Sequence, residues 1–167
     1  MTDRLGTNTG KGVLCREPLA RAWETPALTA IAEAELQIGW SPVGPGTLPT
    51  RAVLGDRGGM WHRDAYSLFE DETVDLALPQ YELTCLAPMQ DLSRGEGGTE
   101  FVLGSHRINL SAMGLTTVEA VAEWAETQPR FEPAVKAGSV LLFSGQVLHR
   151  GAPVTAAPPA GKTSRNR

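Results

Sequence analysis

Short apolar runs alternate with turn-forming residues along most of the chain, and this pattern predicts a mainly β protein. The runs are rich in Val, Leu, Phe and Thr, and Gly, Pro, Asp or Ser separates them. Strands are predicted within residues 50–55, 81–89, 99–104 and 138–149. The last segment is the longest apolar run, and we interpret it as one continuous strand.

Two segments show helical rather than strand periodicity. In the first, Thr25 is the expected N-cap, Pro26 takes the first helical position and Gly39 is expected to end the helix. The second covers residues 116–129 and is closed by Pro129. The apolar residues at helical spacing are Leu28, Ile31, Ala32 and Leu36 in the first helix, and Val118, Val121, Ala122 and Ala125 in the second. Each helix is amphipathic, so each is expected to cover another element with one face.

Short strands, irregular loops and only two helices argue against a doubly wound α/β fold. They favour a double-sheet jelly roll, or a small barrel, with flanking α-helices. The chain has 167 residues, no visible repeat and no linker between two cores, so we expect one jelly-roll domain over residues 1–167. The open mouth of such a fold is a common place for a binding site.

Charge and cysteine content exclude several classes of function. A net charge of −4, without a basic run, gives no electrostatic case for binding nucleic acid or an anionic membrane. Cys15 and Cys85 lack CxxC spacing, so they indicate neither a disulfide framework nor a zinc site and suit a reducing compartment. Because no segment resembles a signal peptide or a membrane span, we expect a cytoplasmic protein. The oligomeric state is not indicated.

The stretch "GGMWHRDAYSLFEDE" carries the first candidate chemistry. In an extended segment, residues i and i+2 project to the same face, so His62 and Asp64 point together while Arg63 points away. An imidazole beside a carboxylate supplies two ligands of a facial triad, which holds Fe(II) and leaves positions open for a cosubstrate and O2. The ordinary alternative is a polar loop with three solvated side chains.

A third ligand must be His106 or His149, since the chain has three histidines. His106 follows a Gly-Ser turn, where a histidine that bonds its own loop is the more ordinary interpretation. His149 ends the longest predicted strand, and counting back by twos places Phe143 and Leu141 on its face. A lone histidine there is more often a core residue. Beside a waiting His-x-Asp pair, however, it is favoured as the ligand.

Three blocks in order, "WHRDAYSLF", "TCLAPMQDLSRGEGGTEFVLGSHR" and "AGSVLLFSGQVLHRGAP", resemble the phytanoyl-CoA dioxygenase family of Fe(II)/2-oxoglutarate-dependent oxygenases. The resemblance runs from about Thr50 to the C-terminus. It implies a double-stranded β-helix with His62, Asp64 and His149 as the iron ligands. It also implies an enzyme that uses O2 and 2-oxoglutarate to hydroxylate a small organic substrate, releasing succinate and CO2. Halogenating relatives carry a small residue in place of the carboxylate, so Asp64 favours hydroxylation.

The family grips 2-oxoglutarate with an arginine that begins the last strand, and the resemblance assigns this role to Arg167 or Arg165. We favour Arg167, because the family's arginine directly precedes the strand. Thr84 maps to a position that faces 2-oxoglutarate in relatives, and a plain strand threonine is the equal alternative. Of the residues that flank the His-x-Asp pair, Trp61 is expected to pack in the core, while Tyr66 is left open between packing and substrate contact.

A second class of function stays open beside the enzyme. The stretch before His62 is shorter than in the family, and the strand expected after Arg167 is missing, so we expect the sequence to lack its last strand. The alternative is a non-catalytic jelly-roll protein that retains at most metal binding. No cluster of basic residues marks a surface for coenzyme A, so phytanoyl-CoA itself is not implied as the substrate.

Overall fold

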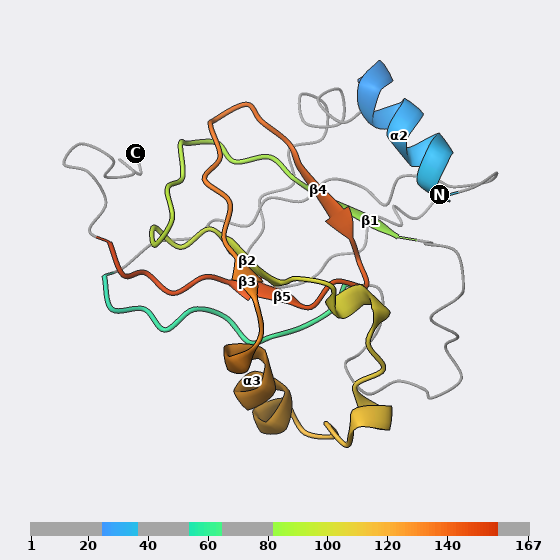
Figure 1. The fold of residues 1–167 in the computed structure, drawn as a ribbon. Coiled ribbons are helices and arrows are strands. Elements are labelled where there is room, and N and C mark those ends of the chain that lie inside the picture. Colours follow the sequence, from blue (N-terminus) through green and yellow to red (C-terminus); the bar gives the residue numbers. More distant parts are fainter. Residues whose placement is uncertain (1–24, 37–53, 65–81, 157–167) are drawn as a thin grey trace, which may run out of the picture. The chain divides into compact units, whose positions relative to one another are not determined.

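The computed structural model describes residues 25–36, 54–64 and 82–156. The chain divides into two compact units, Met1–Arg51 and Ala52–Arg167. The elements of both units are labelled in Figure 1. Beside this division, the expectation of one domain over the whole chain stays a prediction.

The described part of the first unit is helix α2 (Pro26–Leu36). The N–H of Leu28 donates to the hydroxyl oxygen of Thr25 at 3.4 Å, and the N–H of Thr29 donates to the Thr25 carbonyl at 3.0 Å. These contacts confirm the predicted N-terminus of the helix. The predicted end at Gly39 lies outside the described residues. No residue of α2 is buried, so the structure does not show what its apolar face covers.

The second unit contains two small antiparallel sheets (Figure 1). Strand β1 (Leu83–Leu86) pairs with β4 (Leu141–Ser144). Strand β2 (Thr99–Val102) lies between β3 (Arg130–Phe131) and β5 (His149–Gly151). The described structure is therefore rich in antiparallel strands, as predicted, while closure into a double-stranded β-helix stays a prediction.

Two of the predicted strands are present in the described structure. Residues 81–89 and 99–104 contain β1 and β2, which confirms both predictions. Of the segment 50–55, only positions 54 and 55 are described, and they form a turn. The short strand β3 was not predicted, because its two residues follow Pro129 and carry no periodicity of their own.

The prediction of one strand over residues 138–149 is wrong. Strand β4 ends at Ser144, a turn follows, and β5 begins at His149. Within the turn, the N–H of Gln146 donates to the Ser144 hydroxyl at 3.2 Å and the N–H of Val147 donates to the Ser144 carbonyl at 3.0 Å. Serine gives these two N–H groups local partners, and the chain turns instead of continuing the ladder. Counting by twos across this turn was therefore not valid.

An extended segment, residues 59–64, lies along β5 on the side opposite β2. The N–H of Gly59 donates to the carbonyl of Gly151 at 2.9 Å. Further along, His62 and His149 form an antiparallel bridge and exchange two backbone hydrogen bonds, 2.9 and 3.0 Å long. The segment thus extends the three-stranded sheet by irregular pairing, and it places position 62 directly opposite position 149.

Helix α3 (Val118–Thr127) supplies part of the core of this unit. Its N-cap is Thr117, whose side chain accepts a hydrogen bond from the N–H of Ala120 at 3.1 Å. Val121 and Ala125 are buried on the predicted face, whereas Val118 is exposed. The buried cluster consists of Trp61, Val102, Leu110, Val121, Ala125 and Leu148. The predicted second helix is confirmed, and its predicted apolar face is confirmed except at Val118.

Two short 3-10 helices, η1 (Ser105–Arg107) and η2 (Ser111–Met113), connect β2 to α3. Ser105 is fully buried, and its hydroxyl donates to the carbonyl of Val102 and accepts from the N–H of Leu148, both at 2.8 Å. The hydroxyl therefore joins the end of β2 to the chain just before β5. No helix within the described ranges is long and apolar enough to cross a membrane.

A group of ion pairs joins α3 to the sheet. The guanidinium of Arg150 lies 2.8 Å from the carboxylate of Glu100 on β2 and 2.9 Å from that of Glu126 on α3. Arg130 also pairs with both glutamates. The same Arg150 group lies 4.4 Å from the centre of the Trp61 ring, a cation–π distance. Because Arg150 is mostly buried, this network holds α3, the sheet and the 59–64 segment in one arrangement.

A Gly58→Ala substitution is expected to destabilise the second unit. Gly58 has a φ of +83°, and a Cβ there would lie 2.5 Å from the carbonyl oxygen of Gly151. Gly104 is the matched control, since its φ is +79° but a Cβ would meet nothing within 4 Å. We expect Gly104→Ala to lower the free energy of unfolding by about 1–2 kcal/mol. Gly58→Ala should lose about 1–3 kcal/mol more, measured by urea unfolding. Equal losses would contradict the close approach.

Candidate metal site

The side chains of residues 62–64 alternate across the extended segment, as predicted. The Nε2 atom of His62 lies 3.7 Å from Oδ1 of Asp64, on one side of the segment. Arg63 points to the other side, where its guanidinium donates to the carbonyls of Ser105 and Ile108, each at 2.8 Å. Arg63 therefore anchors the segment to η1, while its two neighbours are presented together.

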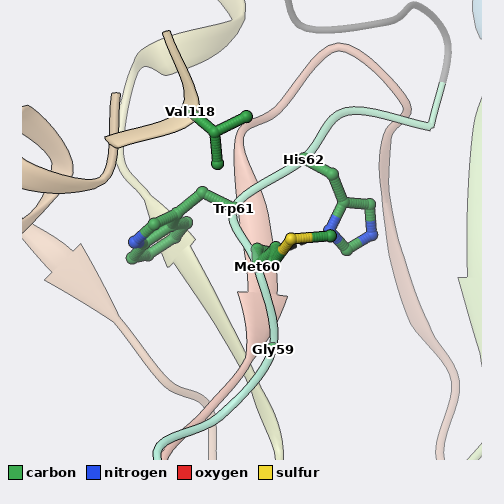
Figure 2. A pocket seen from close by; sticks show the side chains of 5 residues that line it. All are labelled: Gly59, Met60, Trp61, His62 and Val118. Carbon is green, nitrogen blue, oxygen red and sulfur yellow. Dashed lines mark hydrogen bonds between the residues drawn. The ribbon is translucent and has the colours of Figure 1, made fainter. Parts of the chain in front are cut away.

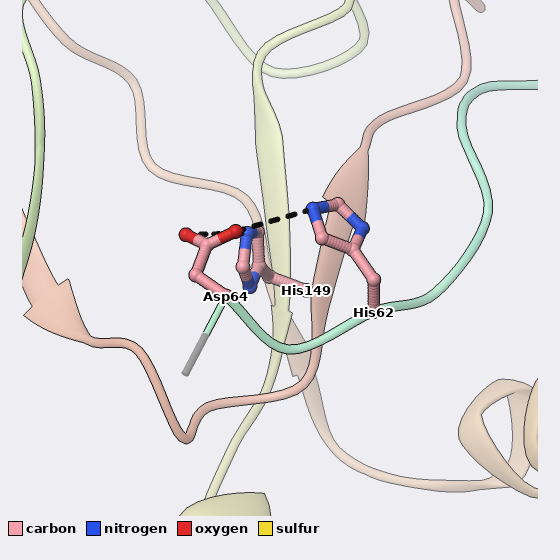
Figure 3. Close-up of side chains that lie close together, drawn as sticks. All are labelled: His62, Asp64 and His149. Atoms are coloured by element: carbon pink, nitrogen blue, oxygen red, sulfur yellow. Dashed lines mark ion pairs between the residues drawn. The ribbon is translucent and has the colours of Figure 1, made fainter. Parts of the chain in front are cut away.

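His149 completes the group from β5. Its Nε2 atom lies 3.5 Å from Oδ2 of Asp64, and its ring centre is 4.2 Å from that of His62. One ligand atom from each of the three side chains lies within 4.8 Å of the others. Figure 3 shows both imidazoles directed at the same carboxylate. The described part of the chain thus brings together the three residues that the sequence pattern selected.

Both histidines hold the tautomer that suits a metal ligand. The Nδ1 atom of His62 lies 2.9 Å from the carbonyl of Met60, and Nδ1 of His149 lies 2.9 Å from the carbonyl of Val147. A carbonyl only accepts, so in the neutral form of each ring Nδ1 carries the proton and Nε2 keeps its lone pair toward the carboxylate. Two imidazole nitrogens and one carboxylate are the donor set of a 2-His-1-carboxylate site, so the residues fit Fe(II).

Burial lowers the pKa of His149 below its ordinary range. The residue is only 5% exposed, and desolvation outweighs the hydrogen bond to Val147 and the charge of Asp64, which act in the opposite direction. The neutral imidazole, which is the form that binds a metal, is therefore favoured. Desolvation, with a contribution from the negative charge of Asp64, also raises the pKa of Glu82.

Strands β1 and β4 also contact the site. The hydroxyl of Thr84 on β1 donates to Oδ2 of Asp64 at 2.7 Å. The ring of Phe143 on β4 packs edge-on against the ring of His149, with centroids 4.8 Å apart. The ring centroid of Phe101 lies 6.0 Å from that of His149. His149 is thus held between aromatic side chains on one side and the carboxylate on the other.

An apolar hollow lies next to the site and shares His62 with it (Figure 2). Its lining residues are Gly59, Met60, Trp61, His62 and Val118. Met60 is 76% exposed, and its position two residues before His62 places it on the ligand-bearing face of the extended segment. Sequence reasoning missed Met60, although the alternation that linked positions 62 and 64 extends to position 60. Trp61 points to the opposite side and is 2% exposed, which confirms that it packs in the core.

The remaining candidates fall in two groups. His106 lies in η1, where its Nε2 accepts from the guanidinium of Arg107 at 3.2 Å, so it bonds its own loop and lies outside the group of three. Arg165, Arg167 and Tyr66 lie outside the described residues, and their roles stay predictions.

A family model described as phytanoyl-CoA dioxygenase (PhyH) matches residues 19–159. The match starts well before Thr50, where the resemblance in the sequence began, and it includes all three residues of the candidate metal site. It ends before the two candidate arginines near the C-terminus. No curated protein matches the chain.

The lowered pKa of His149 predicts how the metal-free protein responds to acid. The unfolded chain binds a proton near pH 6.5, whereas folded His149 resists it, so stability is lost as the pH falls from about 6.5 toward the lowered pKa. One such proton contributes at most about 1.4 kcal/mol per pH unit. Between pH 7.5 and pH 5, the free energy of unfolding, measured with a denaturant, should therefore fall more steeply with decreasing pH for the wild type than for His149→Gln. His106 is present in both proteins, so the difference isolates position 149. Parallel pH profiles would contradict this assignment.

Proposed function

Because the chain belongs to the phytanoyl-CoA dioxygenase family, we propose that it is an Fe(II)/2-oxoglutarate-dependent dioxygenase that hydroxylates a small organic substrate and releases succinate and CO2. The observation that carries the proposal is the convergence of His62, Asp64 and His149, with both Nε2 atoms turned to the carboxylate. The family is in general Fe(II)- and 2-oxoglutarate-dependent. The double-stranded β-helix is part of the same proposal.

In this proposal the two Nε2 atoms and the Asp64 carboxylate hold the iron. The metal, when bound, supplies O2 activation coupled to the oxidative decarboxylation of 2-oxoglutarate. The protein keeps the ligands in place before binding, because both imidazoles are oriented by backbone carbonyls. Burial of His149 against Phe143 excludes water from one side of the site. His62, whose side chain is 50% exposed, leaves the other side accessible.

The hollow beside His62 supports a substrate with an apolar portion. It is formed by backbone at Gly59 together with the side chains of Met60 and Val118, and it adjoins an exposed metal ligand. An apolar group resting there would place a neighbouring C–H bond near the site. Among the described residues that line the hollow there is no lysine or arginine, so this lining does not favour a phosphate group.

The proposal is tested by anaerobic titration of the protein with Fe(II) and then with 2-oxoglutarate. We expect one iron to bind and a visible charge-transfer band to appear when the keto acid chelates it. His149→Ala should abolish the band, because it removes one of three ligands. His106→Ala is the matched control and should retain the band, since His106 bonds its own loop.

Two other results would contradict the proposal in different ways. If the wild type binds iron but shows no band at saturating 2-oxoglutarate, the non-catalytic alternative is favoured. If iron does not bind, His62 and Asp64 are polar residues of a loop and the enzyme assignment fails. Succinate formation under air is the third readout, and it should depend on both iron and 2-oxoglutarate.

The choice between the two arginines can be tested separately. We propose that Arg167 pairs with the distal carboxylate of 2-oxoglutarate, because a planar guanidinium can bond both oxygens. Loss of a charged hydrogen bond of this kind costs about 1.5–3 kcal/mol, or roughly 10–100-fold in affinity. Arg167→Ala should therefore weaken 2-oxoglutarate binding by about that factor without changing iron affinity. Arg165→Ala is the matched control, and the reverse pattern would transfer the role to Arg165.

A further inference from the structure

Thr84 makes a short hydrogen bond to a side chain of the metal site. Its Oγ1 lies 2.7 Å from Oδ2 of Asp64. An ionised carboxylate can only accept, so the threonine hydroxyl is the donor. A hydroxyl has one proton, and here that proton is directed at Asp64.

The register of the β1–β4 pair fixes the position of Thr84. Thr84 lies directly opposite Phe143, and residues opposite each other in an antiparallel pair share a face. The ring of Phe143 on that face contacts His149. One face of this two-stranded sheet therefore contacts two of the three candidate metal ligands.

Backbone hydrogen bonds join the same strands to the segment that carries Asp64. The N–H of Gly145, just after β4, donates to the carbonyl of Glu82, just before β1, at 3.0 Å. The carbonyl of Gly145 accepts from the N–H of Asp64, also at 3.0 Å. Thr84 and Asp64 are thus held relative to each other through Gly145, which is buried. The contact between them belongs to a fixed arrangement of backbone.

We propose that Thr84 is a positioning residue that fixes the Asp64 carboxylate for metal binding; this rests on the proposed function. The terminal torsion of an aspartate is broad, so an unrestrained carboxylate samples many orientations. A donor on a paired strand restricts that rotation, and hydrogen bonds to ligand carboxylates are part of a working metal site. Asp64 then presents its oxygens to His62 and His149 at 3.7 and 3.5 Å without further ordering.

This role differs from the one that the family resemblance implied for Thr84. A carboxylate of 2-oxoglutarate also only accepts hydrogen bonds. With its single proton donated to Asp64, the Thr84 hydroxyl cannot donate to the cosubstrate at the same time. Removing the hydroxyl therefore has a different result under each role. If Thr84 positions Asp64, metal binding is weakened, and if Thr84 contacts 2-oxoglutarate, cosubstrate binding is weakened.

The test is a titration with Mn(II) in the absence of 2-oxoglutarate. Binding is monitored through the electron paramagnetic resonance signal of the free ion. Thr84→Val keeps the shape of the side chain and removes the donor, so we expect metal affinity to fall about 10–100-fold. Thr84→Ser keeps the hydroxyl and should stay near the wild type. Thr99→Val makes the same chemical change on β2, where Thr99 pairs with Gly151, and should bind like the wild type.

Thermal unfolding of the metal-free variants separates positioning from folding. Thr84→Ala is the second variant if Thr84→Val does not fold. A folded variant with wild-type Mn(II) affinity overturns the inference, and weaker 2-oxoglutarate binding in that variant at saturating Mn(II) would assign Thr84 to the cosubstrate. If the wild type itself binds no Mn(II), the proposed function fails and the inference fails with it. Weak metal binding confined to the variants that lack a hydroxyl at position 84 supports the inference.

Discussion

His62 and His149 exchange two backbone hydrogen bonds, and the geometry of the candidate site depends on that exchange. The two histidines are distant in the sequence, and neither has another histidine near it in the sequence. Once their backbones are paired, the two rings lie on the same side of the sheet with centres 4.2 Å apart. The pairing continues to Gly59, where the backbones of two segments come close and a side chain at Gly58 would collide. Glycine at this close approach and histidine at the bridge therefore both depend on the same backbone pairing.

The extended segment separates its anchors from its ligands by alternation. Trp61 and Arg63 point into the fold, one beneath Arg150 and the other onto the carbonyls of η1 and the residue after it. His62 and Asp64 point to the site. A shift of register by one residue would exchange the two sets, burying the ligands and exposing the tryptophan. The cost of exposing Trp61 and of breaking the ion pairs of Arg150 thus specifies the register that places the ligands.

Much of the site was predictable from the sequence because its logic is local. The spacing of His62 and Asp64 predicts a shared face in any extended backbone, and Thr25 marks the start of a helix by cap chemistry alone. His149 was also selected, because a His-x-Asp pair lacked a third ligand. The parity argument, which placed His149 among core residues, assumed an unbroken strand, and the turn after Ser144 invalidates it. What could not be predicted depends on long-range register. The hydrogen bond from Thr84 to Asp64 exists because β1 pairs with β4 in one particular alignment, which no local pattern encodes.

The backbone carbonyls that orient the two imidazoles have a consequence for which positions near the site can be changed. Residue 60 supplies its carbonyl to His62 whatever side chain it carries, and residue 147 does the same for His149. The side chain at position 60 is solvent-exposed beside the hollow. Substitutions at that position can therefore reshape the hollow while the proton on the adjacent ring stays where it is. A change of side chain at position 60 is compatible with a fixed ring orientation at position 62, because the main chain of residue 60, rather than its side chain, contacts the ring.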